Sequence, residues 1–113
     1  MTTDRSAAIR NKGYAVSQAT GVLNIVIARD IGDIGASRSW AQGIIDTAVG
    51  PFRRLEFDVT GLHRLASTTI AGVIQLIDHY RRHGTVEFHL LGANDRTRRT
   101  LEMMKIDGLL EFR

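Results

Sequence analysis

Three short apolar segments that recur at similar intervals constrain the fold of this chain more than any other feature. They are residues 22–28 (VLNIVIA), 55–59 (LEFDV) and 86–91 (VEFHLL). Runs of this kind are typical of β-strands, and the nearly continuous run at 22–28 is typical of a central strand covered on both faces. Segments of helical length separate the three strands, so we expect parallel neighbours joined by right-handed crossovers.

The helices are expected where apolar residues recur at helical spacing. Residues 68–83 should form an amphipathic helix that ends at Gly84, with inward residues Ile70, Val73, Ile74 and Ile77. The same spacing predicts a helix over residues 37–49, and Ser37 or Ser39 would be its N-cap. Gly50-Pro51 would stop that helix, because glycine terminates helices and proline cannot continue them.

A last helix is expected between an N-cap at Asn94 or Asp95 and a stop at Gly108. Its expected inward residues are Leu101 and Met104, and its outward residues are Arg96 and Arg99.

The N-terminal part completes the expected order of elements. Residues 1–12 are polar and aperiodic, which predicts a flexible terminus, and residues 14–18 alternate weakly, as an edge strand does. Residues 19–21 supply a turn, and an exposed edge strand could pair between two copies in a homodimer. The prediction is therefore one α/β domain over residues 13–113, with a mixed, mostly parallel sheet packed by helices in the order ββαβαβα.

Composition narrows the functional classes. The 113-residue chain has no cysteine, so it has no disulfide framework, and no segment approaches the ~20 apolar residues of a membrane span. Its first residues lack the apolar core of a secretory signal, so a cytoplasmic location is expected. The net charge is +3, but the basic residues are dispersed apart from Arg81-Arg82 and the group at Arg96, Arg98 and Arg99. This pattern favours a solvated basic surface over nucleic-acid binding.

The third strand and its continuation read LEFDVTGL, with Asp58 near the end of the strand, and the loop-to-helix junction reads LASTTI over residues 65–70. With these motifs, residues 55–110 resemble the STAS domain of bacterial anti-sigma-factor antagonists, which has an aspartate in the place of Asp58. The strand and helix that follow residue 83 also match the family pattern. Upstream, Gly32-Asp33-Ile34-Gly35 stands in the place of a family loop. The resemblance implies the α/β fold predicted above.

The resemblance also implies a phosphorylation site. In the antagonists a serine at this junction is phosphorylated by an anti-sigma kinase, and the matching residue is Ser67, with Thr68 as the alternative acceptor. A helix start suits a phosphate, because the dipole and the first amides favour negative charge. A helix N-cap is the competing role for Ser67. The chain departs from the family at Ala66 and Gly35, which replace aspartates, and at Thr69, which replaces glycine.

The predicted function is that of a protein-binding regulator. Its implied partners are an anti-sigma factor or serine kinase and a cognate phosphatase, and phosphorylation of Ser67 would control binding. The expected partner-binding residues are Gly32, Asp33, Ile34, Gly35, Ala66, Ser67, Thr68 and Thr69. The alternative is a phosphorylation-independent STAS module, such as a regulatory scaffold or the cytosolic subunit of a lipid-type ABC transporter. A ligand- or nucleic-acid-binding protein that exploits the basic surface is a third hypothesis.

No catalytic residue, metal site or cofactor is predicted. His79 and His83 are spaced as metal ligands can be, but no third ligand is evident, and His63 and His89 are isolated in the sequence. Ser67 lacks a nucleophile elbow, and the glycine loop at 32–35 matches no nucleotide-binding motif. Trp40 and Phe52 are expected in the core. Met103 and Met104 are expected to pack ordinarily, with an adaptable contact surface as the alternative.

Overall fold

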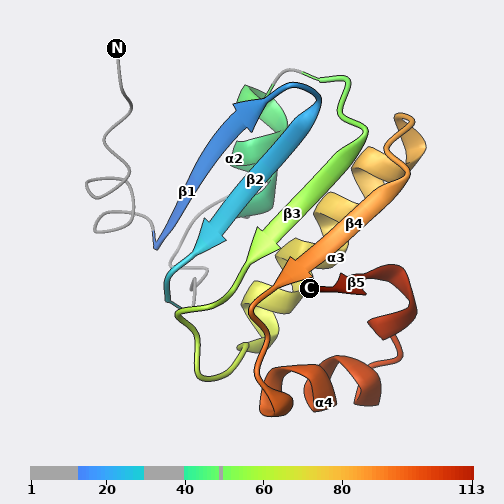
Figure 1. The fold of residues 1–113 in the computed structure, drawn as a ribbon. Coiled ribbons are helices and arrows are strands. Elements are labelled where there is room, and N and C mark those ends of the chain that lie inside the picture. The colour runs from blue at the N-terminus through green and yellow to red at the C-terminus, as the bar shows by residue number, and fades with distance from the viewer. Residues whose placement is uncertain (1–12, 30–39, 49) are drawn as a thin grey trace.

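Five strands lie side by side in the order in which they occur in the chain (Figure 1). The structure is a computed structural model and describes residues 13–29, 40–48 and 50–113. The strands are β1 (Tyr14–Ala19), β2 (Val22–Ile27), β3 (Arg54–Asp58), β4 (Glu87–Leu91) and β5 (Glu111–Phe112). β1 and β2 are antiparallel, and every later pair is parallel. The predicted mixed, mostly parallel α/β fold is thus confirmed.

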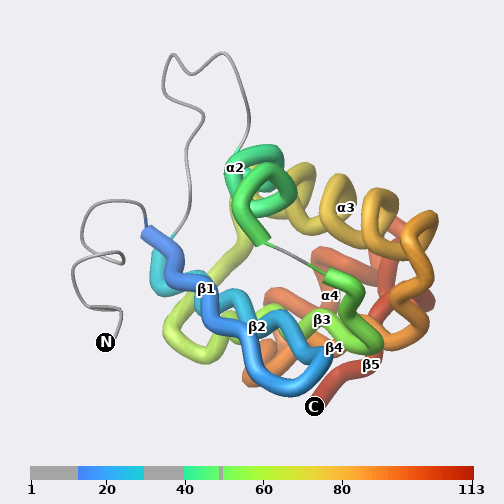
Figure 2. Tube along the Cα trace, turned by 90° about the horizontal axis from the view of Figure 1, so that it is seen from above, coloured from blue at the N-terminus to red at the C-terminus, as the bar shows by residue number. Residues whose placement is uncertain are grey.

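The helices of the described residues cover one face of the sheet (Figure 2). They are α2 (Trp40–Thr47), α3 (Ser67–Arg82) and α4 (Asp95–Met103), and a short 3₁₀ helix, η1 (Asp107–Leu109), follows α4. In this part of the chain every helix is too short or too polar to serve as a membrane span. The predicted residues 1–12, the loop at 32–35, and Ser37, Ser39 and Val49 lie outside the described residues.

The core lies between the sheet and the helices. Leu23, Ile25 and Ile27 of β2 are completely buried, and the residues between them on the strand are half-exposed. The same alternation occurs in β3, where Leu55 and Phe57 are buried. The prediction that residues 22–28 are covered on both faces is therefore wrong, because the helices pack on one face and leave the other half-exposed.

A tight hairpin turn joins β1 to β2, as the sequence predicted for residues 19–21. Thr20 and Gly21 both have a left-handed backbone, with φ of 44° and 78°. A positive φ at both central residues matches the right-handed twist of the flanking strands, which explains the glycine. β1 pairs only with β2 in the sheet, so it is an edge strand as expected.

Helices α2 and α3 approach each other closely at Gly72. A Cβ atom at this position would lie 2.2 Å from the ring of Trp40, so only glycine leaves room for the indole. Trp40 and Phe52 are both buried, which confirms their expected place in the core. The close packing of α2 against α3 therefore depends on the absence of a side chain at residue 72.

The end of the chain differs from the prediction. Helix α4 ends at Met103 and not at Gly108, because Lys105 adopts a left-handed φ of 60°. Met104, expected to face inward, is 46% exposed, and Met103 is 78% exposed, so neither packs as an ordinary core residue. Leu101 is buried as predicted. The chain then forms η1 and strand β5, which the sequence analysis did not anticipate.

Candidate functional site

The candidate phosphoacceptor lies at the first residue of helix α3. The cap position before it belongs to Ala66, whose backbone is extended (φ −74°, ψ 156°), and no side chain caps the helix there. The competing role of Ser67, that of the helix N-cap, is therefore excluded. The first bond of the helical ladder runs from the Ile70 N–H to the Ala66 carbonyl at 3.0 Å. Ser67 is thus held by helical backbone geometry, and its side chain is exposed.

The residues around Ser67 differ in their accessibility. Thr68 is exposed like Ser67, Ala66 is half-buried, and Thr69 is completely buried. The Trp40 indole N–H donates to the Thr68 carbonyl at 3.5 Å, so α2 holds the first turn of α3. A partner that meets this surface would contact Ser67 and Thr68 directly, whereas Thr69 faces the core.

The loop between β3 and α3 is fastened to the start of α4. The Asn94 side-chain amide donates to the His63 carbonyl at 3.0 Å, and its oxygen accepts the Thr97 N–H at 2.8 Å. Asn94 is therefore the N-cap of α4, as predicted, and it also ties two loops together. Leu62 and Leu65 of the same loop are buried. The segment that leads into Ser67 is thus anchored by packing and by a hydrogen bond.

A second contact between loops lies at the carboxyl ends of β3 and β4. The Asp58 carboxylate accepts from the Thr60 N–H at 3.0 Å and from the Thr60 hydroxyl at 2.6 Å. A Cβ at Gly92, which has a φ of +74°, would lie 2.0 Å from the Thr60 hydroxyl oxygen. Asp58, singled out by the sequence, thus orders the turn after β3, and Gly92 lets the neighbouring loop pack against it.

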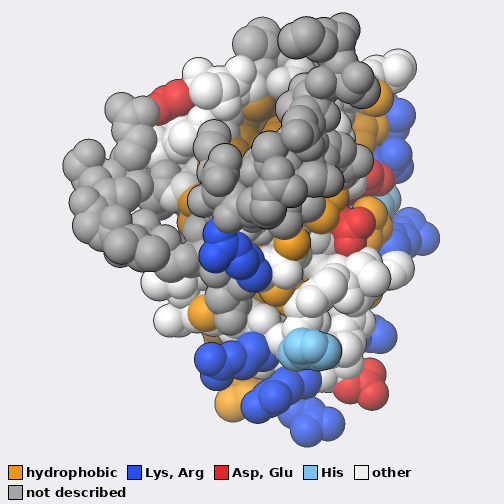
Figure 3. Space-filling view, turned by 90° about the vertical axis from the view of Figure 1, so that its left-hand side faces the viewer, with side chains coloured by type: hydrophobic (Ala, Val, Ile, Leu, Met, Phe, Trp, Pro, Cys, Tyr) orange, Lys and Arg blue, Asp and Glu red, His pale blue; other side chains and the backbone are white. Residues whose placement is uncertain are grey.

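Arginines outnumber acidic residues at this edge, where Asp58 and Asp95 also lie. Helix α3 has no acidic residue in its first turn, so its own carboxylates do not offset the positive end of the dipole. Exposed arginines occur in the segments that meet at this edge: Arg29 after β2, Arg64 before α3, and Arg96 and Arg99 in α4. Figure 3 shows Lys and Arg side chains gathered at the lower end of the molecule together with a histidine. Such a surface favours anionic groups.

His79 and His83 lie at the opposite end of α3. Their rings stack with centroids 4.3 Å apart, and the His83 Nδ1 lies 2.7 Å from the His79 carbonyl oxygen. Partial burial lowers the pKa of His79 below 6.5, and the nearby His83 and Arg82 charges lower it further. Because His79 lies in the last turn of α3 and Ser67 in the first, the histidine pair is remote from Ser67.

The sequence analysis missed the surroundings of His89. This histidine is buried on the half-exposed face of the sheet, and its Nε2 lies between the carboxylates of Glu87 and Glu111. The alternation of β4 could have paired Glu87 with His89, because both point to the same face. Glu111 could not have been placed without knowing that β5 pairs with β4.

The mixed five-stranded sheet with helices on one face defines a small α/β domain, and Ser67 is exposed where helix α3 begins. The family model of the STAS domain matches residues 9–113, so the chain belongs to the STAS family. No curated protein matches the sequence.

Two solved structures share this fold. A candidate anti-sigma factor antagonist from Thermotoga maritima has a TM-score of 0.71 at 11% identity, covering 88% of this chain and 84% of its own. An anti-sigma factor antagonist from Mycobacterium paratuberculosis has a TM-score of 0.67 at 16% identity, covering 88% of this chain and 82% of its own. At such identities the likeness concerns the fold.

Proposed function

We propose that this protein is a partner-switching regulator that binds an anti-sigma factor with serine kinase activity. Binding uses the surface centred on Ser67 and Thr68, and phosphorylation of Ser67 ends the interaction. The role is recognition and not catalysis, and such a partner places the protein in the cytoplasm. Membership of the STAS family and the fold shared with anti-sigma factor antagonists support the proposal.

One observation carries the proposal: Ser67 is an exposed residue at the first helical position, and it does not cap the helix. A cap serine is committed to a hydrogen bond that phosphorylation would disturb, whereas the Ser67 hydroxyl is available to a kinase. A phosphate adds a charge of about −1.5 to −2 at the positive end of the α3 dipole. The helix therefore tolerates the modification, and the effect falls on the partner.

The charge of the surrounding surface suggests what the partner looks like. The exposed arginines of α4 favour an acidic surface on the partner. A phosphate on Ser67 repels that surface and also adds bulk that must be desolvated. Binding is thus lost without any change in the fold.

The test compares Ser67→Ala and Ser67→Glu for binding to the purified anti-sigma kinase by isothermal titration calorimetry. We expect Ser67→Ala to bind like the unmodified protein and Ser67→Glu to bind at least about tenfold more weakly, since one buried like-charge contact costs several kcal/mol. Gln18→Glu is the matched control, because it adds the same charge at an exposed residue near the end of β1. The end of β1 lies beside the start of β2, at the end of the sheet opposite the loop that leads into α3 (Figure 1). The affinity of this control should not change.

Intact-mass analysis after incubation with the kinase and ATP tests the modification itself. One phosphoryl group on the unmodified protein and none on Ser67→Ala supports the proposal. A phosphoryl group that persists in Ser67→Ala but disappears in Thr68→Val moves the acceptor to Thr68.

Ala66 favours a second candidate function. The family aspartate before the serine is replaced by the cap residue Ala66, so a carboxylate is missing beside the hydroxyl. Equal affinity of Ser67→Ala and Ser67→Glu, with no phosphorylation, would contradict the switch. It would favour a constitutive STAS module, such as a subunit of a lipid-type ABC transporter.

A further inference from the structure

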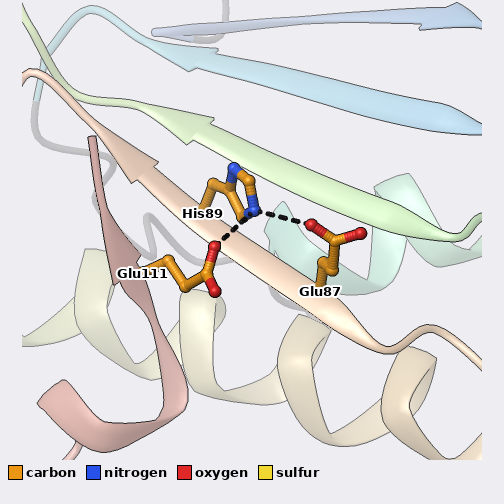
Figure 4. A group of neighbouring side chains, drawn as sticks. All are labelled: Glu87, His89 and Glu111. Carbon is orange, nitrogen blue, oxygen red and sulfur yellow. Dashed lines mark hydrogen bonds and ion pairs between the residues drawn. The ribbon is translucent and has the colours of Figure 1, made fainter.

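A row of polar side chains crosses the half-exposed face of the sheet, on the side away from the helices. The strand registers align Asn24 with Glu56, Glu56 with His89 and His89 with Glu111. Near the end of this row, Glu87 precedes His89 by two residues on β4 and points to the same face. Two neighbouring strands thus bring one imidazole and two carboxylates together (Figure 4).

The geometry of this cluster is close. The His89 Nε2 lies 3.1 Å from a Glu87 oxygen and 2.9 Å from a Glu111 oxygen. The three ligand atoms all lie within 4.8 Å of one another. Ligands on a tetrahedral zinc ion with bonds of about 2.0–2.2 Å are about 3.4 Å apart, so small side-chain rotations would bring all three into position.

The hydrogen bonds within the cluster share a single donor position. The Nε2 atom carries at most one hydrogen, yet two carboxylate oxygens lie within hydrogen-bonding distance of it. The histidine side chain is only 7% exposed, so water has little access to it. A cation at the centre would contact the lone pair of the nitrogen and both carboxylates at once.

The charges that face the cluster also favour a cation. Glu56, Glu87 and Glu111 contribute three negative charges, while Arg54 and Arg113 contribute two positive charges, so these five side chains carry a net charge of −1. Arg54 is held 3.3 Å from Glu56. Arg113 lies 3.0 Å from the same Glu111 oxygen that faces His89, so it competes for that ligand.

Access to the site is open from solvent. The Glu87 and Glu111 side chains are 41% and 55% exposed, whereas His89 forms the buried floor. We infer that Glu87, His89 and Glu111 form a binding site for a first-row divalent cation such as Zn²⁺, which fastens β5 to β4. One imidazole and two carboxylates suit zinc better than magnesium, and water would complete the coordination. The site is separate from the Ser67 surface and does not depend on the proposed function.

The test is isothermal titration of ZnCl₂ into untagged protein that has been treated with EDTA. We expect one saturable site per chain, and MgCl₂ at the same concentration should not compete. Glu111→Gln, Glu87→Gln and His89→Gln should each weaken binding at least about tenfold, because even outer-shell changes cost 10–100-fold. Arg113→Gln should strengthen it, because the competing guanidinium is removed.

The control is the double variant His79→Gln, His83→Gln. It removes the histidine pair at the end of α3 and should leave the affinity for zinc unchanged. His89 is buried, so its variant could misfold. The variants of the exposed carboxylates Glu87 and Glu111 are therefore the decisive ones. Zinc should also shift the backbone amide resonances of β4 and β5 and leave those near His79 in place. The inference is overturned if the protein shows no saturable binding, or if both glutamate variants bind like the unmodified protein.

Discussion

Gly72 sets the distance between two helices by having no side chain. Alanine raises helix stability by up to about 1 kcal/mol over glycine, but a Cβ here would lie 2.2 Å from the Trp40 ring. Overpacking of this kind costs about 1–3 kcal/mol, and the indole is rigid, so the clash should outweigh the gain in propensity. We expect Gly72→Ala to lower the free energy of unfolding by about 1–2 kcal/mol.

Urea unfolding followed by the fluorescence of Trp40, the only tryptophan, measures this effect. The matched control is Gly43→Ala in α2, where the added Cβ would meet only the Tyr14 hydroxyl at 3.8 Å. That variant should be stabilised. If Gly72→Ala were as stable as Gly43→Ala, the result would contradict the close packing of Trp40 against Gly72.

His79 provides a prediction of pH dependence. Its folded pKa lies below 6.5, because partial burial and then the charges of His83 and Arg82 disfavour the imidazolium. The unfolded chain therefore binds the proton more readily, and stability rises with pH in this window. The contribution of His79 is complete above about pH 6.5 and is lost as the pH falls through the lowered pKa.

An NMR titration of the imidazole resonances measures this pKa directly. His83→Gln removes one of the causes and should raise the pKa of His79 towards 6.5, although burial keeps it somewhat lower. An unchanged His79 titration in this variant would show that the two rings do not interact electrostatically.

Single residues were the hardest to place from the sequence. The N-cap is a competing role for Ser67, because serine is preferred there, but Leu65 and Ile70 are both buried, which fits a helix that begins at Ser67. With the helix beginning at Ser67, the residue before it, Ala66, is the N-cap. His89 is isolated in the sequence, because its partner Glu111 belongs to a two-residue strand, which is too short to leave a pattern.

Among the elements, helix α4 was predicted with the correct start and the wrong end. Asn94 caps it as expected, because its side chain can accept the Thr97 N–H. The sequence favoured Gly108 as the stop, yet Lys105 takes the left-handed position. The Ile106 N–H bonds to the Leu101 carbonyl at 3.1 Å and the Lys105 N–H bonds to the Glu102 carbonyl at 3.0 Å, a Schellman ending. Burial of Leu101 and Ile106 outweighs the strain.

That ending yields a stability prediction. A side chain in the left-handed region costs about 1–2 kcal/mol, whereas glycine adopts it freely but loses more entropy on folding. Lys105→Gly should therefore raise the free energy of unfolding by about 0.5–1 kcal/mol. Thermal unfolding measures the change, and Lys105→Ala, which removes the charge but keeps the strain, should not be stabilised. Equal melting temperatures for all three proteins would contradict a strained Lys105.

At the scale of the whole molecule the sequence was most informative. The apolar strands and the amphipathic helix over residues 68–83 led to the α/β fold, because burial requires that pattern over many residues at once. Which face the helices cover could not be read from β2, since its residues on the half-exposed face include Val22 and Val26. Contacts between loops, such as Asn94 with His63, depend on the assembled sheet and leave no local trace.

Strand order in this sheet is the same as chain order. Each strand therefore docks beside the one made just before it, and no later segment has to be inserted between two strands already paired. A chain emerging from the ribosome could thus extend its sheet one strand at a time, and the final residues would cover the edge of β4 that had been open until then.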